Sequence, residues 1–388
     1  MAQANVIKNE TVVALTAETT EGTAVDPSGA TDYLQVLADG VESALERDEI
    51  ERQVLTSTVE RVASRVGQKN TTATLPIEFK AAGTEGEYPE SELLWQSLMG
   101  GKRQNDEDTT TTGNTSTVLE FGATPTFEVG DCVLVKESGA YEVRPVSAVD
   151  ADSVTLAFAL DNGAPSDGVV VAKVSTFFHD ALNDSSSLTL TQYLGNEIKE
   201  QIDGMRVASM SLDGWEAGGV ATSNFTLNGL GMSHADGAAP HTPSYDDSLP
   251  PVALGACMWL GGTKLQYQSL SMTVENTLVP IESACDPDGK IGQRYTAQSV
   301  EVTVNPYMDD ATTTFFDNFN DNDDVSFFAY MSNPTATDGQ GEQYCAVWIP
   351  QAKIVSRANE DVNGVYADGL TLRAHRSTGG DSLFISFI

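Results

Sequence analysis

The residues of this sequence that are able to do chemistry are few and widely spaced. The passage GMSHA at 231–235 places Ser233 in a context close to the G-x-S-x-G motif, but Ala235 stands where the last glycine belongs. The histidines and cysteines form no C-x-x-C or H-E-x-x-H arrangement, which argues against zinc binding and redox chemistry. These residues are His179, His234, His241 and His375, and Cys132, Cys257, Cys285 and Cys345.

Two acidic segments are rich in potential oxygen ligands. DPDGK at 286–290 and DNFNDNDD at 317–324 both lack the spacing of a calcium-binding loop. Solvent-exposed turns explain them. We therefore predict no catalytic, cofactor-binding or metal-binding residues, no cofactor and no enzyme activity.

The composition indicates a globular protein that does not bind nucleic acid. The 388 residues are 40% hydrophobic, and 21 Lys and Arg face 56 Asp and Glu, which gives a formal net charge of -35. Nucleic-acid binders usually carry a basic surface. No apolar stretch approaches the roughly 18 residues of a membrane helix, and the opening MAQANVIKNETVVAL does not resemble a signal peptide. We expect cytoplasmic assembly and no membrane insertion.

Alternation of apolar and polar residues predicts extended strands over most of the chain. TATLPIEFKA and SVEVTVNPY each place three apolar residues on one face, and DYLQVLADG is expected to be the first strand. Two short helices are predicted. The first is PESELLWQSL, with Pro89 at its first position and Gly100 or Gly101 after its end. The second is TTTFFDNFN, with Phe315, Phe316 and Phe319 on one side.

The two halves of the chain repeat one order of elements: a strand, a long polar segment, a strand, a helix and further strands. This pattern predicts a duplication. Short valine-rich strands between glycine and aspartate turns interrupt the first half and indicate a small β-barrel or sandwich. The expected units are a first domain over 1–120 and 178–232, an inserted β domain over 121–177, a linker over 233–251 and a second domain over 252–388.

The order of these elements and two sequence passages resemble those of the tail tube proteins of long-tailed bacteriophages. The resemblance rests on the passage GTEGEYPESELL at 83–94 and on GMRVASMSL at 204–212 followed by FTLNG at 225–229. It covers most of residues 30–100 and 185–388. It implies a mainly β fold with two tandem antiparallel β-sandwich or barrel tube domains, each with one short flanking helix. The inserted small β-barrel domain departs from the family pattern and is expected outside the tube.

The resemblance also implies an assembly. Subunits of this family join into rings, and the rings stack into a hollow cylinder, so open sheet edges would pair with neighbouring copies. Two tube domains per chain predict a trimer with pseudo-sixfold symmetry, and a hexamer is the alternative. The implied location is the virion tail, assembled in the host cytoplasm. The implied partners are the tail terminator, the baseplate or tip proteins and the tape-measure protein.

Two long segments, about 42–70 and about 276–296, match the inter-ring stacking loop of the family. Mixed charge in the first suits docking against a neighbouring ring. The candidate stacking residues are Glu46, Arg47, Asp48, Glu49, Glu51, Arg52, Glu60, Arg61, Arg65, Asp286, Asp288, Lys290 and Arg294.

The acidic charge suggests how such a tube would treat DNA. A carboxylate-rich lining repels phosphate, so that DNA passes through the lumen without specific binding during genome ejection. Three alternative functions share the composition: another virion protein such as a baseplate or capsid decoration protein, a glycan-binding β-sandwich adhesin, and a β-sandwich depolymerase.

Overall fold

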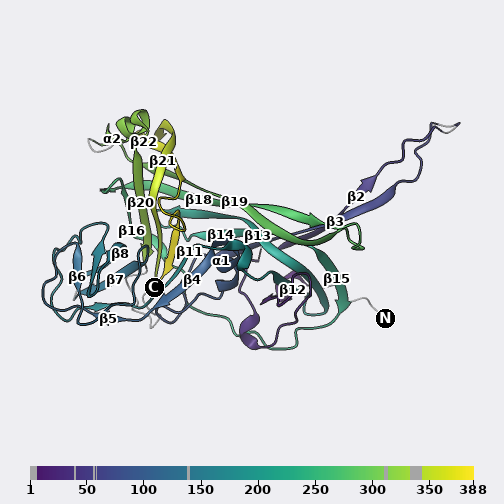
Figure 1. Cartoon of the computed structure of the whole chain (residues 1–388), viewed down its shortest axis with the longest axis horizontal. Helices are drawn as coiled ribbons and strands as arrows, with labels where there is room; N and C mark the ends of the chain where they lie inside the picture. The colour runs from purple at the N-terminus through teal and green to yellow at the C-terminus, as the bar shows by residue number, and fades with distance from the viewer. Residues whose placement is uncertain are drawn as a thin grey trace.

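The computed structural model describes residues 7–38, 41–55, 57, 59–137, 140–309, 313–332 and 343–388. The fold is mainly β, as the sequence predicts, and every strand pairing is antiparallel. Figure 1 shows an elongated molecule with a hairpin projecting at one end and a small separate sheet at the other.

The described residues form a sheet of 17 strands and a second sheet of 6 strands. The large sheet contains β1 (Val12–Ala17), β2 (Glu42–Ile50), β3 (Arg65–Glu78), β4 (Gly100–Asn105), β11 (Val174–His179), β12 (Leu188–Leu194), β13 (Ile198–Glu216), β14 (Thr222–Gly229), β15 (Gly231–Asp236), β16 (Val252–Leu260), β17 (Thr263–Leu265), β18 (Tyr267–Glu282), β19 (Lys290–Pro306), β20 (Asp324–Ser332), β21 (Tyr344–Val362), β22 (Val365–Ala374) and β23 (Phe384–Phe387).

One continuous ladder crosses the whole chain. Its order is β2, β3, β14, β13, β18, β19, β22, β21, β20 and β16. The first part of β13 turns away from this ladder and pairs with β12 and β15 instead. The pairing of β13 with β18 therefore joins the two halves of the chain into one sheet.

The predicted alternation is confirmed on the inner face of the sheet. Val300, Val302 and Val304 are at most 2% exposed, and so are Leu75 and Phe225 on neighbouring strands. These side chains belong to one apolar cluster with contributions from both halves of the chain. Burial of apolar surface on this scale is the main source of stability for such a sheet.

The first helix, α1 (Glu92–Met99), packs inside the fold against β13, β4 and β11. Trp95 is 1% exposed, and its indole N–H donates to Ser91 Oγ at 3.0 Å. Gly100 ends the helix with φ +89°, a backbone conformation that favours glycine. Pro89 lies before the helix and not at its first position, because Glu90 and Ser91 form a turn there.

The second helix, α2 (Thr313–Asp321), packs against β21. Phe315 is buried, whereas Phe316 is 49% and Phe319 is 39% exposed, so the three phenylalanines do not share one buried face. Three short 3-10 turns complete the helical elements of the described residues: η1 (Lys8–Glu10), η2 (Ala30–Asp32) and η3 (Leu182–Asp184).

The small sheet packs against the large one and begins at Asp108, upstream of the insert predicted over 121–177. Phe158 stacks on Trp259 at a centroid distance of 6.1 Å and meets Trp348 edge-on at 5.4 Å. Arg144, with no exposed surface, lies 4.5 Å above the Trp259 ring and pairs with Glu142 at 2.7 Å. The strands of the small sheet are β5 (Asp108–Thr109), β6 (Val118–Glu120), β7 (Cys132–Glu137), β8 (Ala140–Val149), β9 (Ser153–Leu156) and β10 (Val170–Val171).

Two local expectations are wrong. The first strand is β1, and the predicted strand DYLQVLADG contributes just an isolated bridge from Tyr33 to Ala14 within its described part. The two long polar segments, expected as loops, are mostly strands, because β2 pairs with β3 and β18 pairs with β19 along their lengths. Hydrogen bonding along a ladder holds them extended despite their polar sequences.

Candidate assembly surfaces

The most prominent surface feature is a hairpin that projects from the body (Figure 1). We call it the arm: β2, β3 as far as Asn70, and the described residues between them. Its register runs from Glu42 opposite Thr74 to Ile50 opposite Arg65. Among the described residues β2 pairs with β3 alone, so its outer edge keeps open hydrogen-bonding groups, which favour pairing with another chain.

The arm differs in charge from the rest of the molecule. Residues 42–70 contain six acidic and five basic side chains, against 56 and 21 in the whole chain. Arg61 pairs with Glu49 at 3.2 Å and with Glu51 at 2.6 Å. These contacts are exposed and contribute little to stability. They leave part of the arm's positive charge without an anionic partner.

Three arginines carry that charge. Arg47, Arg52 and Arg65 are exposed and make no ion pair within the part of the chain that the structure describes. Arg47 also stands directly opposite Lys69 on β3. Like charges in such a cross-strand pair repel each other and are destabilising. An acidic partner beside Arg47 would reduce this repulsion.

The arm also exposes apolar side chains, which the sequence analysis did not single out. Leu55 and Val59 are as exposed as in an extended chain, at 107% and 106%. A monomer gains nothing from such exposure, and apolar groups gathered in this way mark contact surfaces. The signal in the sequence was an apolar residue every few positions among the charges. The exposed set is Leu45, Ile50, Val54, Leu55, Val59 and Val66.

The structure brings the second predicted segment to the base of the arm. Asp288, in the turn between β18 and β19, forms an ion pair with Lys69, and Lys290 donates to Asn70 Oδ1. Burial lowers the pKa of Lys290. Asp286 lies in the same turn, where its backbone N–H donates to Ser283. The turn between β18 and β19 thus lies beside the base of the arm.

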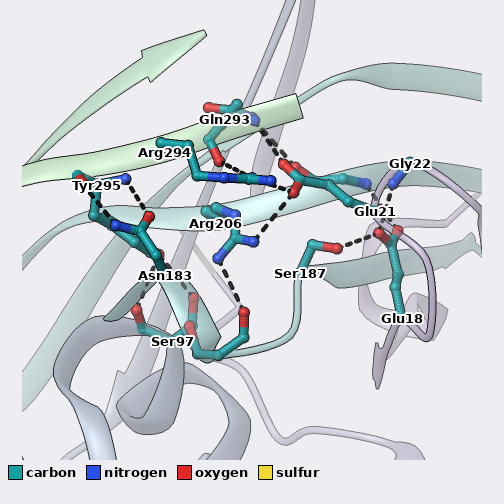
Figure 2. A network of polar contacts seen from close by, with 12 residues as sticks. Glu18, Glu21, Gly22, Ser97, Asn183, Ser187, Arg206, Gln293, Arg294 and Tyr295 are labelled. Atoms are coloured by element: carbon teal, nitrogen blue, oxygen red, sulfur yellow. Dashed lines mark hydrogen bonds and ion pairs between the residues drawn. The ribbon is translucent and has the colours of Figure 1, made fainter. Parts of the chain in front are cut away.

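The remaining stacking candidates divide by position. Glu46 and Asp48 lie on either side of Arg47 on β2, and Glu60 lies in the connection beyond β2; all three are exposed. Arg294 lies apart from the other candidates. It points into a polar network, drawn in Figure 2, where its Nη1 donates to Glu21 at 2.7 Å.

That network fastens the hairpin of β18 and β19 to the body. Glu21 accepts from Arg206 Nη2 at 3.2 Å and from the Gln293 backbone N–H at 2.6 Å (Figure 2). Burial raises the pKa of Glu21, but hydrogen bonds from Arg206, Gln293 and Arg294 outweigh it, so the pKa lies below its ordinary value. The glutamate therefore holds β13 and β19 together as an anion.

A second part of the network extends to α1 and to the N-terminal loop. The Tyr295 hydroxyl donates to the Ser97 carbonyl of α1 at 2.9 Å, and Ser187 donates to Glu18 at 2.6 Å (Figure 2). Glu18 also receives the backbone N–H of Gly204 at 2.8 Å. Burial, and then the charge of Glu18, raises the pKa of Asp203 nearby. A dense set of polar bonds thus connects β19 and β13 to α1 and the N-terminal loop.

Part of the outward face of the continuous ladder forms a third surface, which we call the polar face. All but four of the residues in that part are serine, threonine or asparagine; the exceptions are Asp213, Glu275, Glu301 and Arg373. Arg373 is paired with Glu301 at 3.0 Å, and Lys353, opposite Arg373 on the neighbouring β21, is paired with Asp324 at 2.7 Å. The polar face consists of Thr72, Thr74, Ser209, Ser211, Asp213, Thr222, Asn224, Thr226, Asn228, Ser271, Thr273, Glu275, Ser299, Glu301, Thr303, Thr371 and Arg373.

The side chains considered for chemistry lie in ordinary structural positions. Ser233 is exposed on β15, and its neighbour His234 has Nδ1 3.6 Å from Glu200. His375 contacts Asp324 at 2.8 Å. No group of three or more His, Cys, Asp or Glu suited to a metal occurs among the residues that the structure describes. The described helices are all too short or too polar to span a membrane.

A family model described as phage tail tube protein matches residues 8–352. No curated protein matches the chain.

Proposed function

The chain belongs to the phage tail tube protein family, and from this premise we propose that it is the subunit whose stacked rings form the conduit for genome ejection. The family is structural and places the chain in the virion tail. The observation that carries the proposal is the arm, which exposes Leu55 and Val59 at the end of a hairpin with an open edge. Such a surface gains stability only in contact with another chain.

In this proposal the arm and the turn between β18 and β19 reach from one ring to the next. The contact of Asp288 with Lys69 supports a joint role, because it sets the two segments side by side. The arm meets a surface other than itself, so the contact is heterologous and continues from copy to copy. The stacking role covers every candidate named above except Arg294, whose contact with Glu21 supports an anchoring role.

We propose that the polar face lines the lumen. It combines small hydroxyl and amide side chains with three carboxylates, and its cation is neutralised by Glu301. DNA binding depends on free cations that displace counterions from phosphate. Because the polar face has no free cation to pair with phosphate, DNA would pass along it without binding. The lining is richer in hydroxyl groups than the carboxylate-rich surface expected from the overall charge.

The ring is proposed to contain three chains with pseudo-sixfold symmetry. Each half supplies a long hairpin followed by a short helix: β2, β3 and α1 in the first half, and β18, β19 and α2 in the second. The insert lies at the opposite end of the molecule from the arm, which supports a position outside the tube (Figure 1). Tail terminator, baseplate or tip, and tape-measure proteins are the proposed partners, after assembly in the host cytoplasm.

Electron microscopy of the purified full chain tests the proposal. The expected result is striated hollow tubes, with three subunits per ring in the reconstructed density. Six subunits per ring would agree with the proposed tube but would contradict the ring of three chains. Discrete particles or monomers under all assembly conditions would contradict the tube and favour a baseplate or capsid decoration protein.

A further inference from the structure

A second exposed surface carries acidic side chains, whereas the arm carries charges of both signs. It lies where α2 packs against β21, and Figure 1 places it at the other end of the long axis from the arm. We call it the acidic patch. Its residues are Phe316, Asp317, Phe319, Asp321, Asp323, Val355, Glu360, Asp361, Val365 and Tyr366.

The acidic patch exposes large apolar side chains. At the start of β22 Tyr366 is 66% exposed and Val365 is 53% exposed, and Val355, further along β21, is 41% exposed. On the adjoining helix Phe316 lies under the guanidinium of Arg357, with 5.4 Å from Cζ to the ring centroid. Helix and hairpin therefore form one continuous surface.

The charge of the patch is negative and uncompensated. Arg357 forms an ion pair at 2.6 Å with Asp368, whose side chain is fully buried. Lys353 and His375 both contact Asp324, at 2.7 and 2.8 Å. Among the described residues no cation pairs with Asp317, Asp321, Asp323, Glu360 or Asp361.

We propose that the acidic patch receives the arm of a second copy of this chain. The arm brings the guanidinium groups of Arg47, Arg52 and Arg65, which the patch lacks, and exposed leucine and valine that can pack on the apolar side chains of the patch. In a protein of net charge -35 most surfaces repel one another, whereas the arm, with six acidic and five basic side chains, is close to neutral and its arginines can face the carboxylates of the patch. The opposite positions of the two surfaces produce head-to-tail addition. This inference rests on the proposed function and names the surface on which the arm docks.

Charge exchange between the two surfaces tests the contact. Arg47→Glu, Arg52→Glu and Arg65→Glu form the arm variant; Asp317→Lys, Asp321→Lys and Glu360→Lys form the patch variant. Each alone should lower association about tenfold or more, because like charges then face each other. A chain that carries both sets should regain association. The matched control, Asp150→Lys, Asp152→Lys and Asp167→Lys on exposed sites of the insert, changes net charge equally and should not restore the arm variant.

Cross-linking separates failure of this contact from failure of the tube. Leu55→Cys and Phe319→Cys are placed in separate chains, with Cys257→Ser and Cys285→Ser in both to remove the accessible thiols. Mild oxidation should join the two chains, whereas Tyr141→Cys on the insert in place of Phe319→Cys should not. Tubes that form without the cross-link would overturn the docking alone. A chain that forms neither tubes nor the cross-link would overturn both proposals, and a cross-link without tubes would overturn the tube alone.

Discussion

Glu21 Oε2 lies 3.2 Å from Nη2 of Arg206, and this contact joins the N-terminal loop to the strand shared by both halves of the sheet. Arg206 is 3% exposed, so its charge has little access to water. The same glutamate oxygen accepts from Arg294 on β19. A single carboxylate thus balances two guanidinium groups, one on β13 and one on β19.

Glu21→Gln should therefore destabilise the chain, and more so at neutral pH than in acid. Charged hydrogen bonds of this kind contribute about 2 kcal/mol. Because the pKa of Glu21 is lowered on folding, its contribution is complete above the unfolded value of about 4.3 and disappears as pH falls through the folded value. Urea unfolding at pH 7 and pH 3.5 checks this. A gap between wild type and variant that is equal at both pH values would contradict it, and Glu301→Gln, at an exposed pair, serves as control.

Leu55→Asp with Val59→Asp should abolish tube formation and leave the monomer intact. Both side chains are fully exposed, so their replacement should change the free energy of unfolding by less than about 0.5 kcal/mol. Electron microscopy and thermal unfolding of one sample measure both effects. Val129→Asp, which removes a half-exposed valine of the insert, is the control and should still form tubes. Normal tubes from the arm variant would refute the role of the arm.

Thr226→Lys with Thr273→Lys should turn the polar face into a surface that holds DNA. These threonines project from β14 and β18, and lysine there would pair with phosphate. Genome ejection from particles built with this variant should slow, and the delay should shrink as salt is raised. Thr112→Lys with Thr124→Lys, on exposed positions just before and within the insert, should eject at the wild-type rate. Equal ejection rates for both variants would show that the polar face does not line the lumen.

Arg144→Ala should loosen the joint between the insert and the large sheet. The change leaves Glu142, 8% exposed, without its cation and removes the contact over Trp259. Breaking a buried pair costs about 3–5 kcal/mol. Tryptophan fluorescence during denaturant unfolding should report the loss. Arg373→Ala, at an exposed pair, should cost at most about 1 kcal/mol, and a similar cost for both variants would argue against the joint.

The four cysteines should react with a thiol reagent in two classes. Burial raises the pKa of Cys132 and of Cys345, so both stay protonated and shielded in the folded chain. Cys285 is exposed in the turn between β18 and β19 and should react first, followed by the partly exposed Cys257. Spectrophotometric titration before and after unfolding measures this. Rapid reaction of Cys132 in the native chain would show that the insert opens.

The sequence predicts the inner face of the sheet well, because burial imposes a period of two on every strand. The residues Val300, Val302 and Val304 lie where their spacing places them, and Gly100 ends α1 as expected. The division into two tube domains, an insert and a linker stays a prediction. In the structure the two halves share one ladder and one core.

The assembly surfaces were harder to predict, for physical reasons. The arm has the polar composition of a loop, and only the ladder with β3 makes it a strand. The partners of Glu21 come from positions about 185 and 273 residues further along the chain, and no local pattern encodes such distances. The acidic patch combines α2 with the distant turn of β21 and β22, so its composite character exists only after folding.

The ladder between β13 and β18 also limits how the chain can vary. Each half offers the other a strand edge and part of a common interior. A gene truncated to one half would therefore encode a polypeptide with an unpaired strand edge and an incomplete core. The two halves of the chain depend on each other for folding, and neither can be lost alone.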